Sequence, residues 1–293
     1  MKYTDKLYTD LFALAHHWAN TACRVTDGSF AYKMLGERLY SETENKIKDT
    51  IGNYLDIKPG CEKSAADSIV FSSLSPLPVA LAAFGERCIR TASRLGATQL
   101  LLLGGLFTAQ YPDKTEIFRI DTPEVQAVKE SLLARAGYTY PANRHSITGD
   151  IFNDGWADSL SAMGYNSERL TTVVVGDLPL YLGEKSFKQL LASLFKIIPQ
   201  GSGIVFCYPD RQFFTDTDRI STAFLRRRQK NLLSGASYGE VQMEKLLSDQ
   251  GFRLYEHLNP RQVHSQFFHN REIINRRKLA VCDHINYCLA VKK

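Results

Sequence analysis

Residues 97–121 have the sequence ATQLLLLGGLFTAQYPDKTEIFRID, which contains two short apolar runs, one ending at a glycine pair and the other at a carboxylate. The leucine run at 100–103 is too short for a buried helix and stops at Gly104 and Gly105, which predicts a central parallel strand and a turn that closely approaches a ligand. A second apolar run ends on the carboxylate of Asp121. An acidic residue at the end of the strand after a glycine turn can accept hydrogen bonds from both ribose hydroxyls. The stretch therefore indicates a nucleoside-containing ligand.

The residues after Asp121 begin a helix. Thr122 suits the N-cap, Pro123 suits the first helical position, and Glu124 places a negative charge in the first turn. Because Asp121 follows Gly105 by sixteen residues, we predict one unit of strand, turn, strand and helix. The dinucleotide pattern GxGxxG is absent, so nothing here requires a pyrophosphate, and the glycine pair taken alone also fits an ordinary tight turn.

Length and composition set broad bounds. With 293 residues, 44% of them hydrophobic, the chain can form one large α/β domain with or without an appendage, and we favour one domain. No window approaches the roughly 18 consecutive apolar residues of a membrane span, and the first residues lack the apolar segment of a secretory signal. We therefore expect a cytoplasmic protein with no membrane partner. The formal charge of +5 permits an acidic substrate without indicating a nucleic acid.

The cysteines do not form a recognisable metal or redox motif. Six are scattered without a CxxC pair, several in apolar surroundings: Cys23, Cys61, Cys88, Cys207, Cys282 and Cys288. This pattern favours reduced structural thiols over disulfides. The adjacent histidines at 16–17 lack an HxxxH spacing, so we expect no metal site.

The first part of the chain is predicted to be helical. Apolar residues close to a helical period predict an amphipathic helix over 3–24, and 30–57 predicts one or two more helices. Residues 58–76 are rich in Pro, Gly and Ser and are typical of a loop. This N-terminal segment is longer than a connection to the first strand requires. We therefore interpret 1–75 as a helical cap or lid over the ligand site and 76–293 as the ligand-binding core.

Strands and helices alternate through the core. The predicted strands cover 98–103, 116–121, 146–148, 171–175, 203–208, 252–255 and 284–291. The predicted helices cover 77–95, 123–136, 155–162, 184–198, 239–250 and 260–273, and a polar insertion occupies 209–238. This alternation predicts an α/β fold with a seven-stranded, mostly parallel, doubly wound sheet that binds ligands at the carboxyl ends of its strands.

Two further strands end in residues that we expect at the same ligand edge. Asp150 and Ile151 follow the third strand, and Asp150 could contact an adenine amino group through its backbone or side chain. The fourth strand ends at Gly176, and Asp177 and Tyr181 follow at the expected mouth of the cleft. Asp177 is equally consistent with a turn residue, and Tyr181 with a packing role.

Several short stretches match a known family in order and spacing. Residues 103–108 are similar to the glycine loop GxGLDTR, 118–125 to a ribose strand V/I-D-x-P-x-V and 177–182 to the motif EGLxxYL, with further matches at Asp150, Trp156 and 246–252. From about Asp27 to its end, the chain therefore resembles the leucine carboxyl methyltransferase family, which also contains the tetracenomycin-type polyketide O-methyltransferases.

The resemblance implies a Rossmann-like class I methyltransferase that uses S-adenosyl-L-methionine. It implies O-methylation of a carboxylate, or a hydroxyl, of a small molecule, natural product or peptide, as in secondary metabolism. The implied cofactor-binding residues are Gly104, Gly105, Asp121, Thr122, Asp150, Ile151 and Gly176. An ionised carboxylate acceptor needs no general base, whereas a hydroxyl acceptor does. Asp177 is the candidate base, and Tyr181 is a candidate hydrogen-bond partner for the substrate.

The chain departs from the family pattern on the methionine side of the cofactor. Leu103 replaces the first loop glycine, Phe107-Thr108-Ala109 replaces Asp-Thr-Arg, and Gly176 stands where the family has a glutamate. The family arginine that binds the methionine carboxylate has no basic counterpart. A desolvated carboxylate needs a cation or several N–H donors. The nearest basic residues are Arg87 and Arg90, and Lys33 is our first candidate in the cap.

Two other functions are consistent with the sequence. A family member could bind S-adenosyl-L-methionine but catalyse a different reaction or have lost methyl transfer, since the methionine side is altered. A doubly wound nucleotide enzyme of another kind is disfavoured because no phosphate-binding loop is present. Nucleic-acid methylation is also disfavoured, because the basic run at 225–230 lacks interleaved aromatic residues. That run is more simply a solvated helix face, although it could capture an acidic group.

Overall fold

The computed structural model describes the chain except for residues 1–2, 22–23, 56–69, 105–110, 112–113, 140–141, 152–154, 217–221, 224, 227–229 and 272–279. Four features singled out from the sequence therefore lie outside the described residues. They are Gly105, the loop segment 107–109, the middle of the basic run at 225–230, and the cysteines Cys23 and Cys61.

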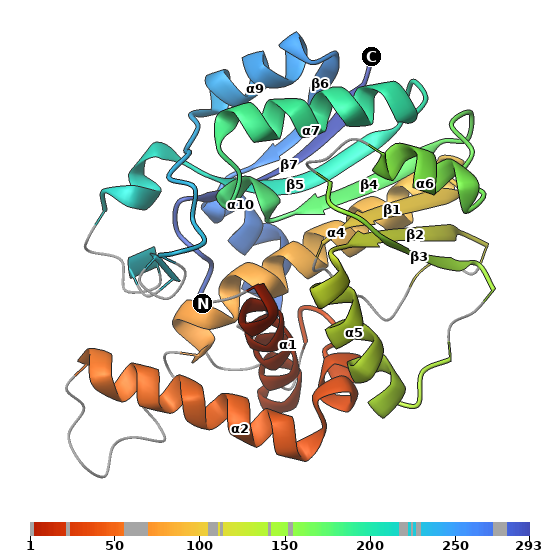
Figure 1. Cartoon of the computed structure of the whole chain (residues 1–293). Coiled ribbons are helices and arrows are strands. Elements are labelled where there is room, and N and C mark those ends of the chain that lie inside the picture. Colours follow the sequence, from red (N-terminus) through yellow and green to blue (C-terminus); the bar gives the residue numbers. More distant parts are fainter. Residues whose placement is uncertain are drawn as a thin grey trace.

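A seven-stranded sheet in the order β3-β2-β1-β4-β5-β7-β6 runs through the described residues (Figure 1). Its strands are β1 (Gln99–Leu103), β2 (Glu116–Asp121), β3 (Arg144–Thr148), β4 (Thr171–Gly176), β5 (Gly203–Pro209), β6 (Phe252–Leu258) and β7 (Ile285–Lys292). The first five pair in parallel, and β7 is antiparallel to both β5 and β6. The expected seven-stranded, mostly parallel sheet is confirmed.

The strand register brings the predicted ligand edge together. Leu103 at the end of β1 lies opposite Ile120 on β2, so Gly104 and Asp121 follow at the same level. The Gly104 amide donates to the Ile120 carbonyl at 3.3 Å, and the Gly149 amide after β3 donates to the Asp121 carbonyl at 2.9 Å. Backbone bonds thus hold three strand ends in one row.

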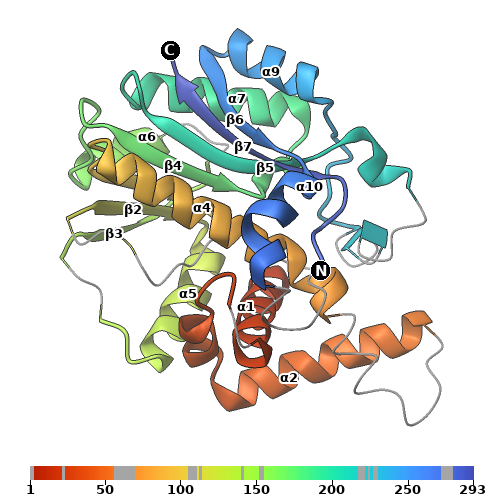
Figure 2. The same ribbon diagram turned by 180° about the vertical axis from the view of Figure 1, so that it is seen from behind.

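Helices cover both faces of the sheet because alternate residues of its buried strands point to opposite sides. Leu100 and Leu102 pack with Ile89, whereas Leu101 and Leu103 join the other face. Figures 1 and 2 show the two layers. One contains α6 (Trp156–Ala162), α7 (Glu184–Ile197) and α9 (Glu240–Asp249), and the other contains α4 (Pro76–Arg94), α5 (Pro123–Arg135) and α10 (Pro260–Val263).

The N-terminal helix α1 (Tyr3–Asn20) packs against α2 (Ser29–Leu55), α4 and α5. Leu7, Leu11 and Leu14 recur at helical spacing and are buried in the cluster that α1 shares with these helices. A Cβ on Gly28 would lie 2.1 Å from the Leu14 carbonyl oxygen, so only glycine lets the chain turn back this closely against α1. The helical start of the chain therefore forms part of the core on the side of α4 and α5.

Most expected boundaries agree with the structure to within a few residues, and the exceptions have local causes. The helix expected over 3–24 ends at Asn20, and α2 is bent at Gly36, whose φ of 63° is not helical. Part of the expected loop 58–76 is instead η1 (Val70–Leu74), a buried π-helical turn. Apolar residues such as Val70 and Leu74 are buried against α1 and α4, which outweighs the loop-like composition.

The C-terminal helix also differs in detail. Residues expected to form one helix over 260–273 start as α10 and continue as a π-helical turn, η4 (His264–Phe268). No helix in the described part of the chain is long and apolar enough to cross a membrane. Among the described cysteines, Cys88, Cys207, Cys282 and Cys288 are buried free thiols. Burial raises the pKa of Cys88 to about 12, so this thiol stays protonated.

Candidate functional site

Two glycines in the left-handed region mark the ends of the central strands. Gly104 follows β1 with a φ of 84°, and Gly176 ends β4 with a φ of 66°. Such φ values strain any residue that carries a Cβ, so both strand ends turn where other residues would not. Ideal Cβ atoms at these positions would lie 3.7 Å from Leu178 and 3.8 Å from Leu81, respectively. The backbone therefore turns sharply beside a cavity at the sheet edge.

The main cavity at this edge has a volume of about 140 Å³. Its lining comes from the ends of β1, β2, β3 and β4 and from α1: Lys6, Leu7, Asp10, Gly104, Ile120, Asp121, Thr122, Val125, Gly149, Asp150, Ile151, Asp177, Leu178 and Tyr181. The structure thus brings together seven of the residues singled out from the sequence, namely Gly104, Asp121, Thr122, Asp150, Ile151, Asp177 and Tyr181.

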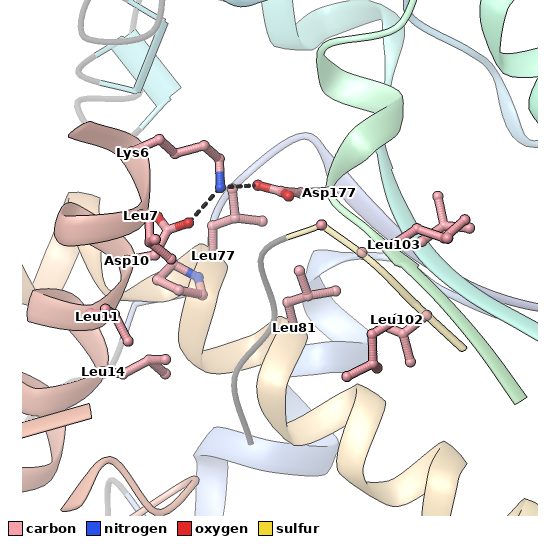
Figure 3. Close-up of a pocket in the computed structure, with 15 residues that line it drawn as sticks. Lys6, Leu7, Asp10, Leu11, Leu14, Leu77, Leu81, Leu102, Leu103 and Asp177 are labelled. Carbon is pink, nitrogen blue, oxygen red and sulfur yellow. Dashed lines mark hydrogen bonds and ion pairs between the residues drawn. The ribbon is translucent and has the colours of Figure 1, made fainter. Parts of the chain in front are cut away.

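A second, smaller cavity of about 30 Å³ adjoins the first and reaches toward the core. Gly176 lines it, as do leucines from three elements, including Leu11 of α1, Leu81 of α4 and Leu102 of β1 (Figure 3). Both cavities are lined by Lys6 and Asp177. The smaller cavity is therefore an apolar recess whose entrance carries charged side chains.

Asp121 is paired with a lysine that sequence analysis did not single out. The Lys129 ammonium on α5 donates to both carboxylate oxygens of Asp121, at 2.6 and 2.8 Å, and to the Gly104 carbonyl at 3.0 Å. The side chains of Lys129 and Asp121 are only 1% and 3% exposed. Burial lowers the pKa of Lys129 to about 8, although the charge of Asp121 opposes this shift. Lys129 thus ties the turn after β1 to the carboxylate after β2.

A second buried lysine enters the site from the N-terminal helix. The Lys6 ammonium lies 2.7 Å from a carboxylate oxygen of Asp177 and also contacts Asp10, one turn further along α1 (Figure 3). The side chains of Lys6 and Asp177 are 9% and 15% exposed. Burial alone would lower the pKa of Lys6, but the charges and hydrogen bonds of Asp10 and Asp177 outweigh it and raise this pKa. Lys6 is therefore a firmly charged group at the cavity wall.

Tyr181 extends the same cluster. Its hydroxyl donates to Asp177 at 3.1 Å, and the Lys6 ammonium lies 5.4 Å from the centre of its ring. Burial, together with the negative charge of Asp177, raises the pKa of Tyr181 well above its usual value. The hydroxyl therefore acts as a donor and does not ionise near neutral pH.

The polar groups on the β2 and β3 side of the cavity are more open to solvent. Thr122 and Asp150 are exposed, and Ile151 is partly buried beside them. Thr122 occupies the predicted N-cap of α5, but its side chain forms no capping hydrogen bond. These residues surround an opening in which a flat apolar ring could lie against Ile151 with polar groups at its edge.

The basic residues proposed from the sequence for the methionine carboxylate lie away from both cavities. Lys33 is exposed on α2, and Arg90 is exposed on α4. Arg87 donates to Glu256 at 2.7 Å and to Gln266 at 2.8 Å, so it joins α4 to β6 and η4. None of the three lines either cavity.

Lys6 and Asp10, which line the cavities, and Lys129, which supports Asp121, differ in how far the sequence reveals them. Lys6 and Asp10 are four residues apart on an amphipathic helix, which usually indicates a solvated surface pair. Lys129, however, precedes the buried Leu132 and Leu133 by three and four residues, which places it on the buried face of α5. That spacing is the one signal in the sequence that could have identified a buried lysine.

The described residues around the cavities combine three kinds of binding surface. The carboxylate of Asp121 can accept from a diol, Ile151 and Val125 offer an apolar wall, and Lys6 and Asp177 present opposite charges side by side. A ligand that fits this arrangement carries a ribose, a flat ring and a zwitterionic end. No group of three or more His, Cys, Asp or Glu side chains suited to holding a metal occurs in the described ranges.

Comparison with known proteins gives a consistent result. The sequence model of a family described as leucine carboxyl methyltransferase matches residues 12–195, which is more than half of the chain. A Bacillus subtilis (strain 168) protein named "Putative S-adenosyl-L-methionine-dependent methyltransferase YktD" is 29% identical over 274 residues, covering 90% of this chain and 82% of that protein. A Mycobacteroides abscessus protein of the same description is 30% identical over 150 residues, about half of each chain.

Solved structures with the same fold include two bacterial proteins. A crystal structure described as a putative methyltransferase from Thermobifida fusca YX has a TM-score of 0.57 at 18% identity and covers 94% of this chain and 95% of that one. A DUF574 family protein from Streptomyces avermitilis has a TM-score of 0.52 at 17% identity, covering 84% and 96%. These similarities show the overall fold, and they agree with the architecture that the family resemblance implies.

Proposed function

Since this chain belongs to the leucine carboxyl methyltransferase family and is an S-adenosyl-L-methionine-dependent methyltransferase, we propose that it methylates an oxygen of a carboxylate on a small molecule, natural product or peptide. The observation that carries this proposal is the pairing of the carboxylates at the inner part of the cavity. Asp121 is paired with Lys129, and Asp10 and Asp177 are both paired with Lys6.

The residues around the cavity fit the cofactor in chemistry and position. Asp121 would accept the ribose hydroxyls, Gly104 would give close access to the backbone, and Asp150 and Ile151 would border the adenine. Thr122 and Gly176 would complete the walls. The independent support is the composition of the cavity, which offers a buried carboxylate beside an apolar wall and a charged cluster at the opposite end.

The pairing of the carboxylates favours an acceptor that is already ionised. Asp177 already accepts from the Lys6 ammonium and the Tyr181 hydroxyl, and both carboxylate oxygens of Asp121 accept from Lys129. Tyr181 stays protonated because its pKa is raised, and the described lining includes no histidine or cysteine. A hydroxyl acceptor would need a base to remove its proton, whereas a carboxylate does not. Asp177 is therefore better suited to orienting groups than to acting as a general base.

When bound, the cofactor supplies a methyl group on a positively charged sulfur, and its transfer to a carboxylate oxygen forms a C–O bond while the C–S bond breaks and its electron pair stays on sulfur. The protein contributes alignment and the exclusion of water. Leu7 and Leu178 border the cavity with apolar surface, and Tyr181 also lines it while its single O–H donates to Asp177. We propose that Tyr181 helps to orient the acceptor.

We also propose that the helical segment 1–75 acts as a lid over this site. Its first helix supplies Lys6, Leu7 and Asp10 to the cavity wall, so the site is incomplete without it. A segment that contributes a wall and also shields the reacting groups from water suits a substrate that must enter and leave. The ligand-binding core would then comprise 76–293.

The proposal is tested by incubating the purified protein with methyl-labelled S-adenosyl-L-methionine and a panel of carboxylic acids, short peptides, phenols and alcohols. A methyl ester releases labelled methanol in mild base, whereas a methyl ether does not. We expect labelled, base-labile product from one class of carboxylic acid. A base-stable product would contradict the carboxylate acceptor, and tight cofactor binding without any product across the panel would favour a family member that has lost methyl transfer.

A further inference from the structure

We propose that Lys6 of the N-terminal helix binds the α-carboxylate of the cofactor, and that Asp10 and Asp177 bind its ammonium group. This inference rests on the proposed cofactor site and extends it to residues that neither the family motifs nor the sequence analysis assigned. It makes α1 a part of the cofactor site itself as well as a cover over the acceptor.

The need for such a group follows from the chemistry of the ligand. The amino-acid end of S-adenosyl-L-methionine carries a carboxylate and an ammonium, and both lose solvation when they enter a closed cleft. A buried charge is tolerated only where an opposite charge and hydrogen bonds meet it. Lys33, Arg87 and Arg90 do not line the cavity, whereas Lys6 lines it and the buried Lys129 holds Asp121 beside it.

The two lysines are not equivalent candidates. Lys129 uses its three N–H bonds on the two oxygens of Asp121 and on the Gly104 carbonyl, and it is only 1% exposed. Lys6 contacts Asp10 and Asp177 and lines both cavities. An ammonium has three N–H bonds, so Lys6 retains a donor beyond these two contacts. Of these two lysines, Lys6 is the one that can reach a ligand.

The position of Lys6 also matches the place where the amino-acid end must lie. Asp121 marks the ribose at the end of β2, and the cofactor chain then has to run past Gly104 toward the end of β4. Lys6, Asp10, Gly104 and Asp177 line both the main cavity and the recess, so they surround the junction between the two. Figure 3 shows Lys6 and Asp10 reaching this junction from α1 on the side facing Asp177.

Asp177 has the geometry of a group that can accept a second cation. Its contacts with Lys6 and with the Tyr181 hydroxyl both use Oδ2. Among the described residues, neither of these contacts uses Oδ1, which leaves acceptor capacity on a side chain that is 15% exposed and lines both cavities. An ammonium placed there would form a charge-assisted hydrogen bond.

The test is a titration of wild-type protein, Lys6→Met and the matched control Lys33→Met with three ligands, read by isothermal calorimetry. S-adenosyl-L-methionine has the whole amino-acid end, decarboxylated S-adenosylmethionine lacks only the carboxylate, and 5′-methylthioadenosine lacks the entire end. Lys6→Met keeps the length and apolar stem of the lysine. Urea denaturation of each variant shows whether it is folded.

We expect Lys6→Met to lower the affinity for S-adenosyl-L-methionine by about 10- to 100-fold, which is the range for the loss of one charge-assisted hydrogen bond. Decarboxylated S-adenosylmethionine should bind Lys6→Met at least as well as wild type, because the two carboxylates then face its ammonium alone. The affinity for 5′-methylthioadenosine should not change, and Lys33→Met should match wild type with all three ligands.

Equal losses for all three ligands would overturn the proposal, since they would make Lys6 a structural residue. Unchanged S-adenosyl-L-methionine affinity in Lys6→Met would overturn it as well. If Lys6→Met does not fold, Asp10→Asn is tested in its place. It should lower the affinity for the two ligands that retain the ammonium and leave the affinity for 5′-methylthioadenosine unchanged. Failure of the wild-type protein to bind even 5′-methylthioadenosine would instead refute the proposed cofactor site, so the two failures are distinguishable.

Discussion

The two ends of the proposed cofactor site are built in different ways. At the adenosine end, the buried pair Asp121–Lys129 comes from a strand and the helix that directly follows it, eight residues apart. At the methionine end, Lys6 and Asp10 of the first helix meet Asp177 after the fourth strand, about 170 residues away. One end is local in the sequence and almost dry, and the other is assembled across the fold and borders the cavity.

This difference indicates that the lysine at the adenosine end supports the site, whereas the lysine at the methionine end contacts the ligand. Lys129 is fully engaged with protein groups, so its role is to hold Asp121 and the turn at Gly104 in position. Lys6 shares its charge with two carboxylates and retains a donor toward the cavity. We therefore expect substitutions at the adenosine end to affect stability most, and substitutions at the methionine end to affect ligand selection most.

The largest effect is expected from Lys129→Met. It leaves the buried carboxylate of Asp121 without a cation, which typically costs about 3–5 kcal/mol of unfolding free energy. Urea denaturation of the ligand-free protein measures this loss, with Lys188→Met as control because Lys188 and Glu184 form an exposed pair on α7. The double variant Lys129→Met/Asp121→Asn should recover part of the loss. A single variant as stable as the control would remove the supporting role of Lys129.

The second effect concerns affinity at the adenosine end. Replacing Asp121 by alanine would leave a cavity and the buried Lys129 without its partner, so the isosteric Asp121→Asn is the cleaner test. We expect Asp121→Asn to weaken the binding free energy of S-adenosyl-L-methionine by about 2–3 kcal/mol, because the charge-assisted hydrogen bonds to the ribose are lost. Because 5′-methylthioadenosine keeps the ribose, it should lose the same amount in a calorimetric titration. A loss of affinity confined to S-adenosyl-L-methionine would contradict this role, because it would mean that Asp121 contacts the methionine end of the ligand.

The third effect is a difference in pH dependence between the two lysines. The pKa of Lys129 is lowered to about 8, below the ordinary lysine value, so between these pH values the unfolded chain binds more protons than the folded one. The contribution of Lys129 to stability therefore rises with pH above about 8, by at most about 1 kcal/mol per pH unit. The pKa of Lys6 is raised, so its contribution stays constant below the ordinary lysine pKa and falls only above it.

These different pH dependences are measured by urea denaturation between pH 7.5 and 10, relative to reference variants that lack each lysine. For Lys129 the reference is Lys129→Met/Asp121→Asn, which also removes the carboxylate, and for Lys6 it is Lys6→Met. Stability relative to the first reference should rise across the range, and stability relative to the second should remain level. A level curve for both lysines would contradict the lowered pKa of Lys129.

The same contrast explains which parts of the site could be predicted from the sequence. Gly104, Asp121 and Asp150 were recognisable because each lies at or just after the end of a strand, and parallel strands end at one edge. Asp177 was recognisable for the same reason. These predictions needed only the order of strands and helices, which hydrophobic patterns reveal.

Lys6 and Lys129 were not recognised because a lysine on a helix is normally solvated. Their burial depends on a carboxylate brought close by the fold, and for Lys6 that carboxylate is on a distant strand. Lys33 lies in the expected cap, but it is exposed on α2. No local pattern in the sequence indicates that its side chain faces solvent. A single sequence does not show which charged residues meet in the folded protein.

The smallest effect is expected from Asp150→Ala, at the open edge of the adenosine end. Asp150 is exposed and would contact a neutral amino group, so one hydrogen bond of about 1 kcal/mol net is at stake, less than at Asp121. Solvent can replace the missing acceptor at such a position, whereas nothing replaces the buried carboxylate of Asp121. Calorimetry with 5′-methylthioadenosine isolates the effect because this ligand never reaches the methionine end. A larger loss at Asp150 than at Asp121→Asn would reverse the roles given to these two strand ends and place the ribose beside β3.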